Sequence, residues 1–304
     1  MAGKLQHSAA DRTSMKGLVI SRFGSEADIE LPDGQILRCH LRRKLENIVC
    51  GDRVLCQNEG DHQGVVTKIL PRESVLERPI RYQGLKAVAA NLDQICIVVS
   101  PEPEFSSLIL DKYLVAAEHA GINALIIFNK ADLLPGYADI PQQLDVYRAL
   151  DYTVLLTSVK KPEGLEALQQ SLSNHSSVFV GQSGVGKSSL VNALLPEVQA
   201  QVSEISDNSG LGTHTTTASR LYHLPGHGIL IDSPGIREFS LEHIDKKLLK
   251  QGYREIYRCS EFCKYRDCLH LQEPGCAVKK AVEENLIDKG RYARYIKILQ
   301  QEDE

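Results

Sequence analysis

The sequence predicts a multi-domain protein in which a small N-terminal β-barrel precedes a doubly wound α/β domain and a mainly helical, metal-binding C-terminal segment. Short β-branched runs separated by turn residues fill residues 16–70, which is typical of a small antiparallel barrel. Apolar runs then alternate with helical patterns, which indicates a largely parallel sheet. Four of the eight cysteines crowd into residues 259–276, which favours metal ligation in a reducing compartment.

The composition sets limits on the class of protein. A chain of 304 residues has room for two or three domains, and 42% hydrophobic with 24% charged residues is typical of a soluble globular protein. The net charge of -4 excludes a uniformly basic nucleic-acid binder, so any such contact must come from local patches. No apolar run approaches the roughly 20 residues that span a bilayer, and the first residues lack the apolar core of a signal peptide. We therefore expect a cytoplasmic protein with no membrane partner.

The barrel is expected at residues 16–80, after a disordered tail at residues 1–15. Its strands are predicted at residues 18–23, 27–31, 35–41, 52–57 and 65–70. A basic cluster on it can be interpreted as a solvated face or as a nucleic-acid contact; its members are Arg38, Arg42, Arg43 and Lys44. The scattered cysteines are expected to be small buried hydrophobes: Cys39, Cys50, Cys56 and Cys96.

The α/β domain is expected at residues 81–242, after a linker around residues 72–86. Strands are predicted at residues 94–100, 123–130, 152–158, 177–181, 220–224 and 228–233, and helices at 108–119, 142–150, 164–172 and 187–195. Strands as apolar as 124–128 fit a sheet that is covered on both faces. Residues 243–304 then predict short helices around the cysteine cluster. Lysines and arginines there suggest a phosphate-facing side: Lys279, Lys280, Arg291, Arg294 and Lys297.

A phosphate-binding loop is predicted at residues 181–188, which read GQSGVGKS and fit G-x-x-x-x-G-K-[ST] between a strand and a helix. Glycines let backbone N–H groups curl around phosphates, and the helix N-terminus favours their charge. Lys187 should reach the β- and γ-phosphates and stabilise the transition state, while the Ser188 hydroxyl should bind Mg²⁺. The predicted phosphate contacts are Gly181, Gln182, Ser183, Gly184, Val185, Gly186, Lys187, Ser188 and Ser189.

A second magnesium ligand is predicted where the strand GILI ends in DSPG. Asp232 at the end of a strand can hold Mg²⁺ as a Walker-B acid does, and Gly235 follows it at the spacing D-x-x-G. A threonine hydroxyl of the preceding loop could complete the Mg²⁺ shell and sense the γ-phosphate. Thr215, Thr216 and Thr217 all remain candidates for that role.

Guanine recognition is predicted from the sequence NKAD after the strand ALIIF. The carboxylate of Asp132 can accept hydrogen bonds from guanine N1–H and the N2 amino group, which adenine does not offer. Lys130 would lie along the base, and Asn129 would tie this loop to the phosphate loop. Ser158, at the end of the next strand, belongs to a companion loop that meets the base with backbone N–H groups. The predicted contacts are Asn129, Lys130, Ala131, Asp132 and Ser158.

The residue that orients the attacking water is the least defined part of the site. Ile236 follows D-x-x-G at the position where Ras-type proteins have glutamine, so intrinsic hydrolysis should be slow. His214 is the nearest polar candidate to replace that glutamine, since an imidazole can orient or deprotonate water near neutral pH. A purely structural role for His214 is an equally good interpretation.

The order of these motifs is permuted, because NKAD and the Ser158 loop precede the phosphate loop. Permutation preserves a sheet when the original termini lie close together. Here it also connects DSPG directly to the C-terminal segment. We hypothesise that the γ-phosphate state is transmitted to that segment, and equal hydrogen exchange there with GDP and a GTP analogue would contradict this.

A structural zinc site is predicted from the spacing C-x4-C-x-H-x5-C. Three thiolates and an imidazole supply four tetrahedral ligands and leave no position for a catalytic water. The predicted ligands are Cys263, Cys268, His270 and Cys276, with Cys259 as the alternative to Cys263. Zinc would stabilise a segment too small to build its own core.

Together these motifs resemble the RsgA (YjeQ/YloQ) family of circularly permuted, ribosome-associated GTPases. The resemblance extends from residue 16 through NKAD, GQSGVGKSSL, HTTT, DSPG and CKYRDCLH…EPGC. It implies an oligonucleotide-binding (OB) barrel, a G domain with motif order G4-G5-G1-G2-G3, and a zinc domain. It also implies binding to the small (30S) ribosomal subunit and its rRNA late in maturation, with GTP hydrolysis to GDP stimulated by the subunit and coupled to release. One Zn²⁺, Mg²⁺ with GTP, and a monomeric state are expected.

Two other classes of function compete with this interpretation. A metabolic P-loop kinase would fit the phosphate loop, but the guanine-reading sequence NKAD argues against it. An RNA-binding scaffold with an inactive nucleotide site is opposed by the intact Lys187, Ser188, Asp232 and Asp132, because decay should erase at least one of them.

Overall fold

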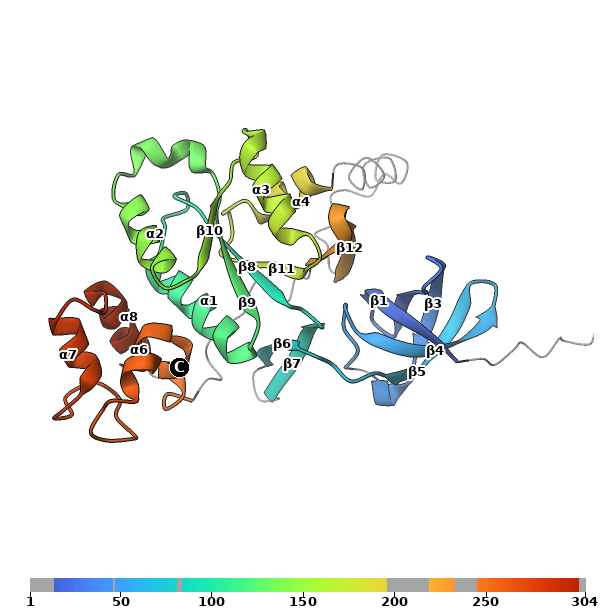
Figure 1. The fold of residues 1–304 in the computed structure, drawn as a ribbon. Helices are drawn as coiled ribbons and strands as arrows, with labels where there is room; N and C mark the ends of the chain where they lie inside the picture. Colours follow the sequence, from blue (N-terminus) through green and yellow to red (C-terminus); the bar gives the residue numbers. More distant parts are fainter. Residues whose placement is uncertain (1–13, 46, 81–83, 196–218, 233–244, 301–304) are drawn as a thin grey trace, which may run out of the picture.

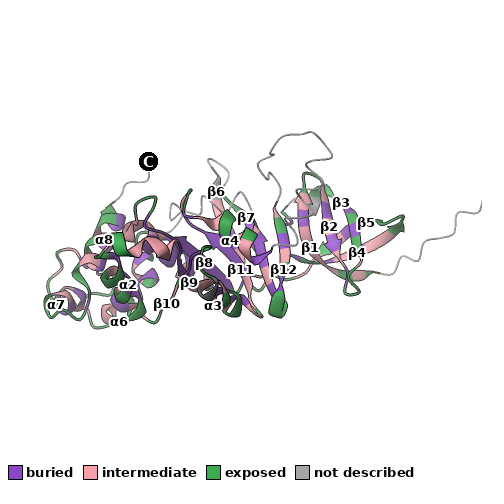
Figure 2. Ribbon diagram, turned by 90° about the horizontal axis from the view of Figure 1, so that it is seen from above, coloured by how far each residue is buried: buried purple, intermediate pink, exposed green. Residues whose placement is uncertain are grey.

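The computed structural model describes residues 14–45, 47–80, 84–195, 219–232 and 245–300. Along the chain, a β-barrel is followed by a central α/β domain and a small helical domain (Figure 1). The barrel and the helical domain lie at opposite ends of the molecule, on either side of the α/β domain (Figures 1 and 2). In the described part of the chain, no helix combines the length and the hydropathy needed to cross a bilayer.

The barrel consists of five strands that close into one ring. They are β1 (Met15–Phe23), β2 (Glu26–Glu30), β3 (Ile36–Leu41), β4 (Arg53–Gly60) and β5 (Gln63–Ile69). Their order is β1-β2-β3-β5-β4, and β4 returns to pair with β1. Alternating side chains such as Val19, Ile29 and Leu37 point inward and are fully buried. The predicted barrel is confirmed, with one departure from an antiparallel pattern, because β3 and β5 are parallel.

A two-stranded hairpin links the barrel to the α/β domain. Strands β6 (Val75–Ile80) and β7 (Gly84–Ala90) pair antiparallel in the region that the sequence suggested was a linker. The predicted boundary between residues 80 and 81 falls within this hairpin, and the division of the chain at 15, 80 and 242 stays a prediction.

The α/β domain is built on a mainly parallel sheet. Strands β8 (Gln94–Val99), β9 (Asn123–Phe128), β10 (Thr153–Leu156), β11 (Ser176–Val180) and β13 (Gly228–Asp232) are parallel, and β12 (Arg220–Leu224) pairs antiparallel with β13. The order is β10-β9-β8-β11-β13-β12. The helices are α1 (Ser107–Ala120), α2 (Ile140–Arg148), α3 (Pro162–Leu172) and α4 (Lys187–Leu194). The predicted doubly wound sheet is confirmed.

Strand β8 shows why the central strands are apolar throughout. Ile95 and Ile97 pack with α1 and α2 in one core, whereas Cys96 and Val98 pack with α3 and α4 in a second. Successive side chains of a strand point to opposite faces, so a sheet covered on both faces requires an unbroken apolar run. The buried strands β8, β9 and β11 run through the middle of the domain in Figure 2.

The barrel also joins the α/β domain through the sheet itself. Strand β1 pairs with β12 at Ser21 and Arg220, which makes the eleven strands one continuous sheet. His223 of β12 lies 2.8 Å from the carboxylate of Glu30 in β2. The strand that follows the region of Thr215–Thr217 is therefore in direct contact with the barrel.

The C-terminal domain consists of short helices around a compact core. They are a 3₁₀ turn at Leu249–Gly252, α6 (Arg254–Ser260), α7 (Ala277–Glu283) and α8 (Lys289–Gln300). Tyr253, Ile256 and Tyr295 are buried there, and Val115 of α1 belongs to the same core. The domain is thus packed on α1 of its neighbour.

The structure tests the predictions about the scattered cysteines and about two C-terminal arginines. The scattered cysteines are all fully buried, as predicted: Cys39, Cys50, Cys56 and Cys96. The expectation that Arg291 and Arg294 face phosphate is wrong, because both pair with buried carboxylates inside the molecule. A basic residue on a helix can face the core where a buried carboxylate is present to pair with it.

Candidate functional site

The phosphate-loop motif lies between the end of β11 and the first turn of α4, as its spacing predicts. Gly181, Gly184 and Gly186 have φ angles of 139°, 83° and 95°, which side chains rarely tolerate. The Lys187 ammonium donates to the carbonyl oxygens of Gly181 and Gln182, each at 2.6 Å. The loop therefore curls tightly at the N-terminus of a helix, where backbone N–H groups can bind an anion.

Asn129 connects the NKAD loop to the phosphate loop. Its side chain is 2% exposed, and its Nδ2 donates to the carbonyl oxygen of Val185 at 2.9 Å. Its Oδ1 accepts a hydrogen bond from the hydroxyl of Thr157 at 3.3 Å. Lys130 reaches the same loop, with Nζ 2.9 Å from the carbonyl oxygen of Gly184. Two segments more than fifty residues apart in sequence thus hold one another in place.

Asp132 lies at the end of the NKAD loop with both carboxylate oxygens engaged. Lys160 Nζ donates to Oδ2 and Ser158 Oγ donates to Oδ1, each at 2.7 Å. These two hydrogen bonds hold the pKa of Asp132 below its usual value. The group is therefore an ionised acceptor, which is the state that N1–H and the N2 amino group of guanine require.

Ser188 and Asp232 lie beside the same small cavity at the foot of the phosphate loop. Lys187 and apolar side chains from β11, α4 and β13 complete its lining. A hydroxyl and a carboxylate next to a phosphate-binding loop are oxygen ligands of the kind that Mg²⁺ prefers. The donor set therefore fits a Mg²⁺ ion that is shared with phosphate.

Several predicted site residues lie outside the described residues. They are Gly235, His214, Thr215, Thr216, Thr217 and Ile236. The roles suggested for them stay predictions.

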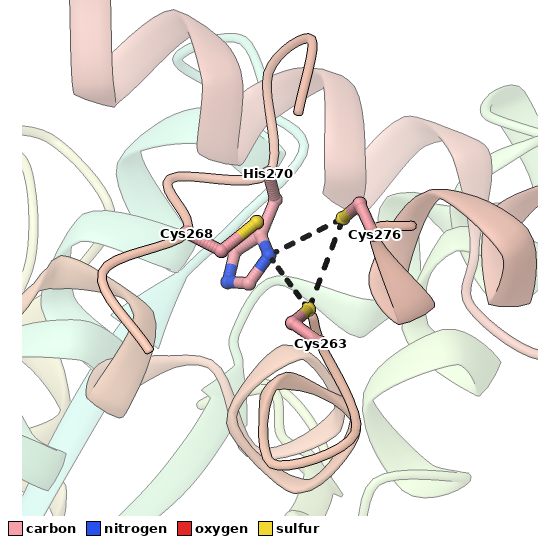
Figure 3. A group of neighbouring side chains, drawn as sticks. All are labelled: Cys263, Cys268, His270 and Cys276. Carbon is pink, nitrogen blue, oxygen red and sulfur yellow. Dashed lines mark hydrogen bonds between the residues drawn. The ribbon is translucent and has the colours of Figure 1, made fainter. Parts of the chain in front are cut away.

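The cysteine cluster of the C-terminal domain converges on one point (Figure 3). The ligand atoms of Cys263, Cys268, His270 and Cys276 all lie within 4.8 Å of one another. His270 Nδ1 faces the sulfur atoms of Cys263 at 3.6 Å and Cys276 at 3.5 Å. Cys263, rather than the alternative Cys259, belongs to this group, so the cluster could hold a metal ion with three thiolates and one imidazole.

The chain around the cluster is organised to present these ligands. Burial holds the pKa of His270 down to about 4, so its imidazole is neutral and available as a ligand. The carboxylate of Glu273 accepts hydrogen bonds from the backbone N–H groups of Leu269 and Leu271, at 2.8 and 2.7 Å. Tyr292 donates to the carbonyl oxygen of His270 at 2.6 Å. Such contacts around the ligands fix their orientation.

Comparison with known proteins agrees with this geometry. A family model described as RsgA GTPase matches residues 69–242. A protein of Haemophilus influenzae named "Small ribosomal subunit biogenesis GTPase RsgA" is 48% identical over 294 residues, which cover 94% of this chain and 85% of the relative. The chain belongs to the RsgA GTPase family. It is accordingly a GTPase, a hydrolase that acts on GTP.

Other members of the RsgA family support the assignment. A protein of the same name from Histophilus somni is 48% identical over 289 residues, 93% of this chain and 83% of that protein. YjeQ from Thermotoga maritima superimposes with a TM-score of 0.77 at 32% identity, covering 94% of this chain and 98% of that chain. YloQ, described as a circularly permuted GTPase, gives 0.75 at 30% identity over 97% and 96%. The predicted barrel, permuted G domain and helical C-terminal domain are thus those of the RsgA fold.

Lys160 is the residue that the sequence did not single out in this RsgA-type site. It lies two positions after Ser158 of the predicted companion loop, but a lone lysine in a polar turn has no distinctive pattern. Only the fold shows that its ammonium meets Asp132, which lies 28 residues earlier in the chain.

Proposed function

We propose that this RsgA-family GTPase assists the late maturation of the small (30S) ribosomal subunit in the cytoplasm. The observation that carries the proposal is the extent of the similarity. Relatives named for small ribosomal subunit biogenesis are 48% identical over more than nine-tenths of this chain. The similarity extends over the barrel, the G domain and the C-terminal domain. All three must be retained if the protein uses them together to bind the subunit.

The proposed cycle begins with GTP in the site formed by the phosphate loop and the NKAD loop. Its contacts are Asn129, Lys130, Ala131, Asp132, Ser158, residues 181–189, Asp232 and Gly235. Mg²⁺ would be held by Ser188, Asp232 and one of Thr215, Thr216 and Thr217. Lys187 would neutralise charge on the transferred phosphoryl group, and His214 is the candidate that orients water. Hydrolysis would then be stimulated by the subunit and coupled to release.

The Cys263 cluster is proposed to bind one structural Zn²⁺. Four soft ligands fill a tetrahedral shell, so the ion would stabilise the fold of the C-terminal domain. Arg42 and Arg43 of the barrel are exposed and are proposed to contact rRNA phosphates. Arg38 contributes less to such a surface, because its guanidinium is bound by Asp28.

The active form is proposed to be a monomer, because the two loops of the nucleotide site come from one chain. Asn129 and Val185 of the same molecule already join them. Light scattering of the free protein would test this, and a stable dimer would contradict it.

GTP hydrolysis by the purified protein, with and without small ribosomal subunits, tests the proposed function. Strong stimulation by small subunits, and none by large subunits, is the expected result. Equal rates in all three reactions would leave a GTPase whose activating partner is not the small subunit.

A further inference from the structure

A cavity of about 750 Å³ lies where the barrel meets the central sheet. One wall is the outer surface of the barrel, at the start of β1 and the turn after β2, and the other wall includes β12 and β13. Figure 1 shows the barrel beside β12. Ser176, the first residue of β11, lines the cavity, whereas the phosphate loop follows Val180, the last residue of that strand. The cavity and the phosphate loop therefore lie at opposite ends of β11.

The wall that the central sheet contributes is apolar. Ile229 and Ile231 of β13 point to the same face of the sheet, because they are two residues apart, and Leu221 of β12 pairs directly with Ile231. All three pack in the core that α1 and α2 form on this face of the sheet. On the barrel side, Leu18 of β1 packs in the same core. The interior of the cavity thus suits an apolar ligand.

Hydrogen bonds hold the walls of the cavity in place. Asn91, directly after β7, has a left-handed backbone with a φ of 54°. Its Nδ2 donates to the carbonyl oxygen of Gly51 in the barrel at 2.7 Å, and its Oδ1 accepts from the backbone N–H of Glu73 at 2.9 Å. The backbone N–H of Ala90 donates to the carbonyl oxygen of Cys50 at 3.1 Å. The barrel and the hairpin are therefore joined beside the cavity, so a ligand would enter a site that is already formed.

The charged side chains that line the cavity come from the barrel. Arg53 pairs with Glu73 at 2.5 Å, and the carboxylate of Glu30 lies 2.8 Å from Nε2 of His223. Lys16, near the start of β1, is exposed and has no ion-pair partner within the part of the chain that the structure describes. Its ammonium is therefore the lining charge that remains available to a ligand.

We propose that this cavity binds a small amphipathic anion, with its apolar body against β12 and β13 and its anionic group beside Lys16. The volume falls within the range of about 300–1,000 Å³ that is typical of small-molecule sites, which are often found between domains. Burial of the apolar body supplies affinity, and the ammonium of Lys16 favours an anion over a cation. The inference goes beyond the proposed function and does not depend on it, because the ligand contacts no residue of the proposed nucleotide site.

Decanoate and 2-naphthoate are the probes that test the proposal, one with a flexible and one with a flat apolar body. Titration calorimetry with the full chain should show saturable binding of at least one of them, and the tighter probe identifies the shape of the body. Decylammonium and 2-naphthylmethylammonium keep the two bodies and reverse the charge, so each should bind at least about fivefold more weakly than its matching anion. Failure of both anions to bind, or equal affinity for anion and cation, overturns the proposal.

Lys16→Glu tests the charged end of the site. Attraction is replaced by repulsion, so the dissociation constant of the bound anion should rise about tenfold. Lys68→Glu is the matched control, because Lys68 is also an exposed barrel lysine but lies on β5, outside the lining of the cavity. This control should change the dissociation constant by less than about twofold. Equal effects of the two variants overturn the role of Lys16.

Ser176→Trp tests the location of the site. Ser176 lies two residues before the core residue Val178 in β11, so its side chain points to the same face of the sheet, toward the cavity that it lines. An indole there would occupy the space of the ligand and should weaken binding at least about tenfold. Thermal unfolding shows whether the variant is folded, and the comparison of Lys16→Glu with Lys68→Glu decides if it is not. Wild-type affinity in folded Ser176→Trp overturns the assignment of the site.

Discussion

At the scale of single residues, two side chains from another loop orient the carboxylate of Asp132. Ser158 and Lys160 each hold one carboxylate oxygen, and the side chain remains 17% exposed. The hydrogen bonds favour the charged form, so the pKa of Asp132 stays below its ordinary value of 3.8. The carboxylate is therefore ionised and oriented, as the proposed contact with guanine requires.

Asp132→Asn should exchange the base preference of the site. The new amide offers one donor and one acceptor, which no longer match guanine N1–H and N2 but do match the N1–H and C2 carbonyl of xanthine. The affinity for GTP should fall about 10- to 100-fold, and the affinity for xanthosine triphosphate should rise. Competition binding checks this, and unchanged discrimination would refute the base-reading role.

The same carboxylate predicts how guanine affinity responds to pH. The folded pKa of Asp132 is depressed, so the ionised form persists from neutral pH down past the ordinary value of 3.8. The contribution of Asp132 to GDP binding should therefore be constant between pH 7 and about pH 5. Titration calorimetry across this range measures it, with Asp132→Asn as the reference that removes the titrating group.

At the scale of elements, the phosphate loop depends on backbone shape and on its contact with the NKAD loop. Gly186 has a φ of 95°, and a Cβ there would lie 2.3 Å from Nδ2 of Asn129. The close approach permits the bond between Asn129 and Val185. One glycine thus serves both the turn into α4 and the junction of two loops.

Gly186→Ala should break this junction. The methyl group cannot fit without displacing Asn129, so GDP affinity should fall by at least about tenfold. Gly60→Ala is a matched control, because Gly60 has a similar φ of 98° but no described atom within 4 Å of the place that a methyl group would occupy. It should lose about 1 kcal/mol of stability from backbone strain alone and leave GDP binding intact. Equal affinities for the two variants would contradict the contact.

The C-terminal cluster should depend on metal. Chelation should release about one zinc per chain and reduce the helical circular dichroism of the domain, since metal binding and folding are coupled. Cys263→Ser should reduce the bound zinc, whereas Cys259→Ser should retain it, because only Cys263 lies among the ligand atoms. Metal analysis of both purified variants measures this; full zinc content in Cys263→Ser would exclude the assignment.

At the scale of the whole molecule, the three parts are connected by different means. The barrel meets the α/β domain through the β1–β12 pairing, whereas the C-terminal domain is held to α1 by buried charges. The region after Asp232 supplies the covalent connection to the C-terminal domain. The α1 network adds a second connection that the linear order of motifs did not suggest.

Arg291→Leu should destabilise the protein, because Arg291 belongs to that network. Removing the arginine leaves Asp111 and Glu255 with fewer cationic partners in the interior, which should cost about 3–5 kcal/mol. Lys297→Leu on the same helix is exposed and should change stability by less than about 0.5 kcal/mol. Urea unfolding of both variants measures the difference, and similar midpoints would show that the buried pair contributes nothing.

Features that depend on local backbone conformation and on the spacing of residues could be predicted from the sequence. It predicted the strands and helices of the α/β domain, the five barrel strands, the phosphate loop before α4, the NKAD loop after β9, and the cysteine cluster. Each follows from periodicity, from glycines that must adopt a positive φ, or from ligands a few residues apart. These features depend on residues that are close together in sequence, so their prediction did not require knowledge of which distant segments pack together.

The contacts between side chains that are distant in sequence could be identified only from the fold. The fold paired Lys160 with Asp132, selected Cys263 over Cys259, and placed Arg291, an expected surface cation, as a buried partner of Asp111. The sequence does not indicate which residue a lysine or an arginine pairs with, because burial and pairing depend on the packing of elements far apart in the chain. The local sequence sets the position of a side chain within its own helix, strand or turn, whereas the packing of distant elements sets its contacts.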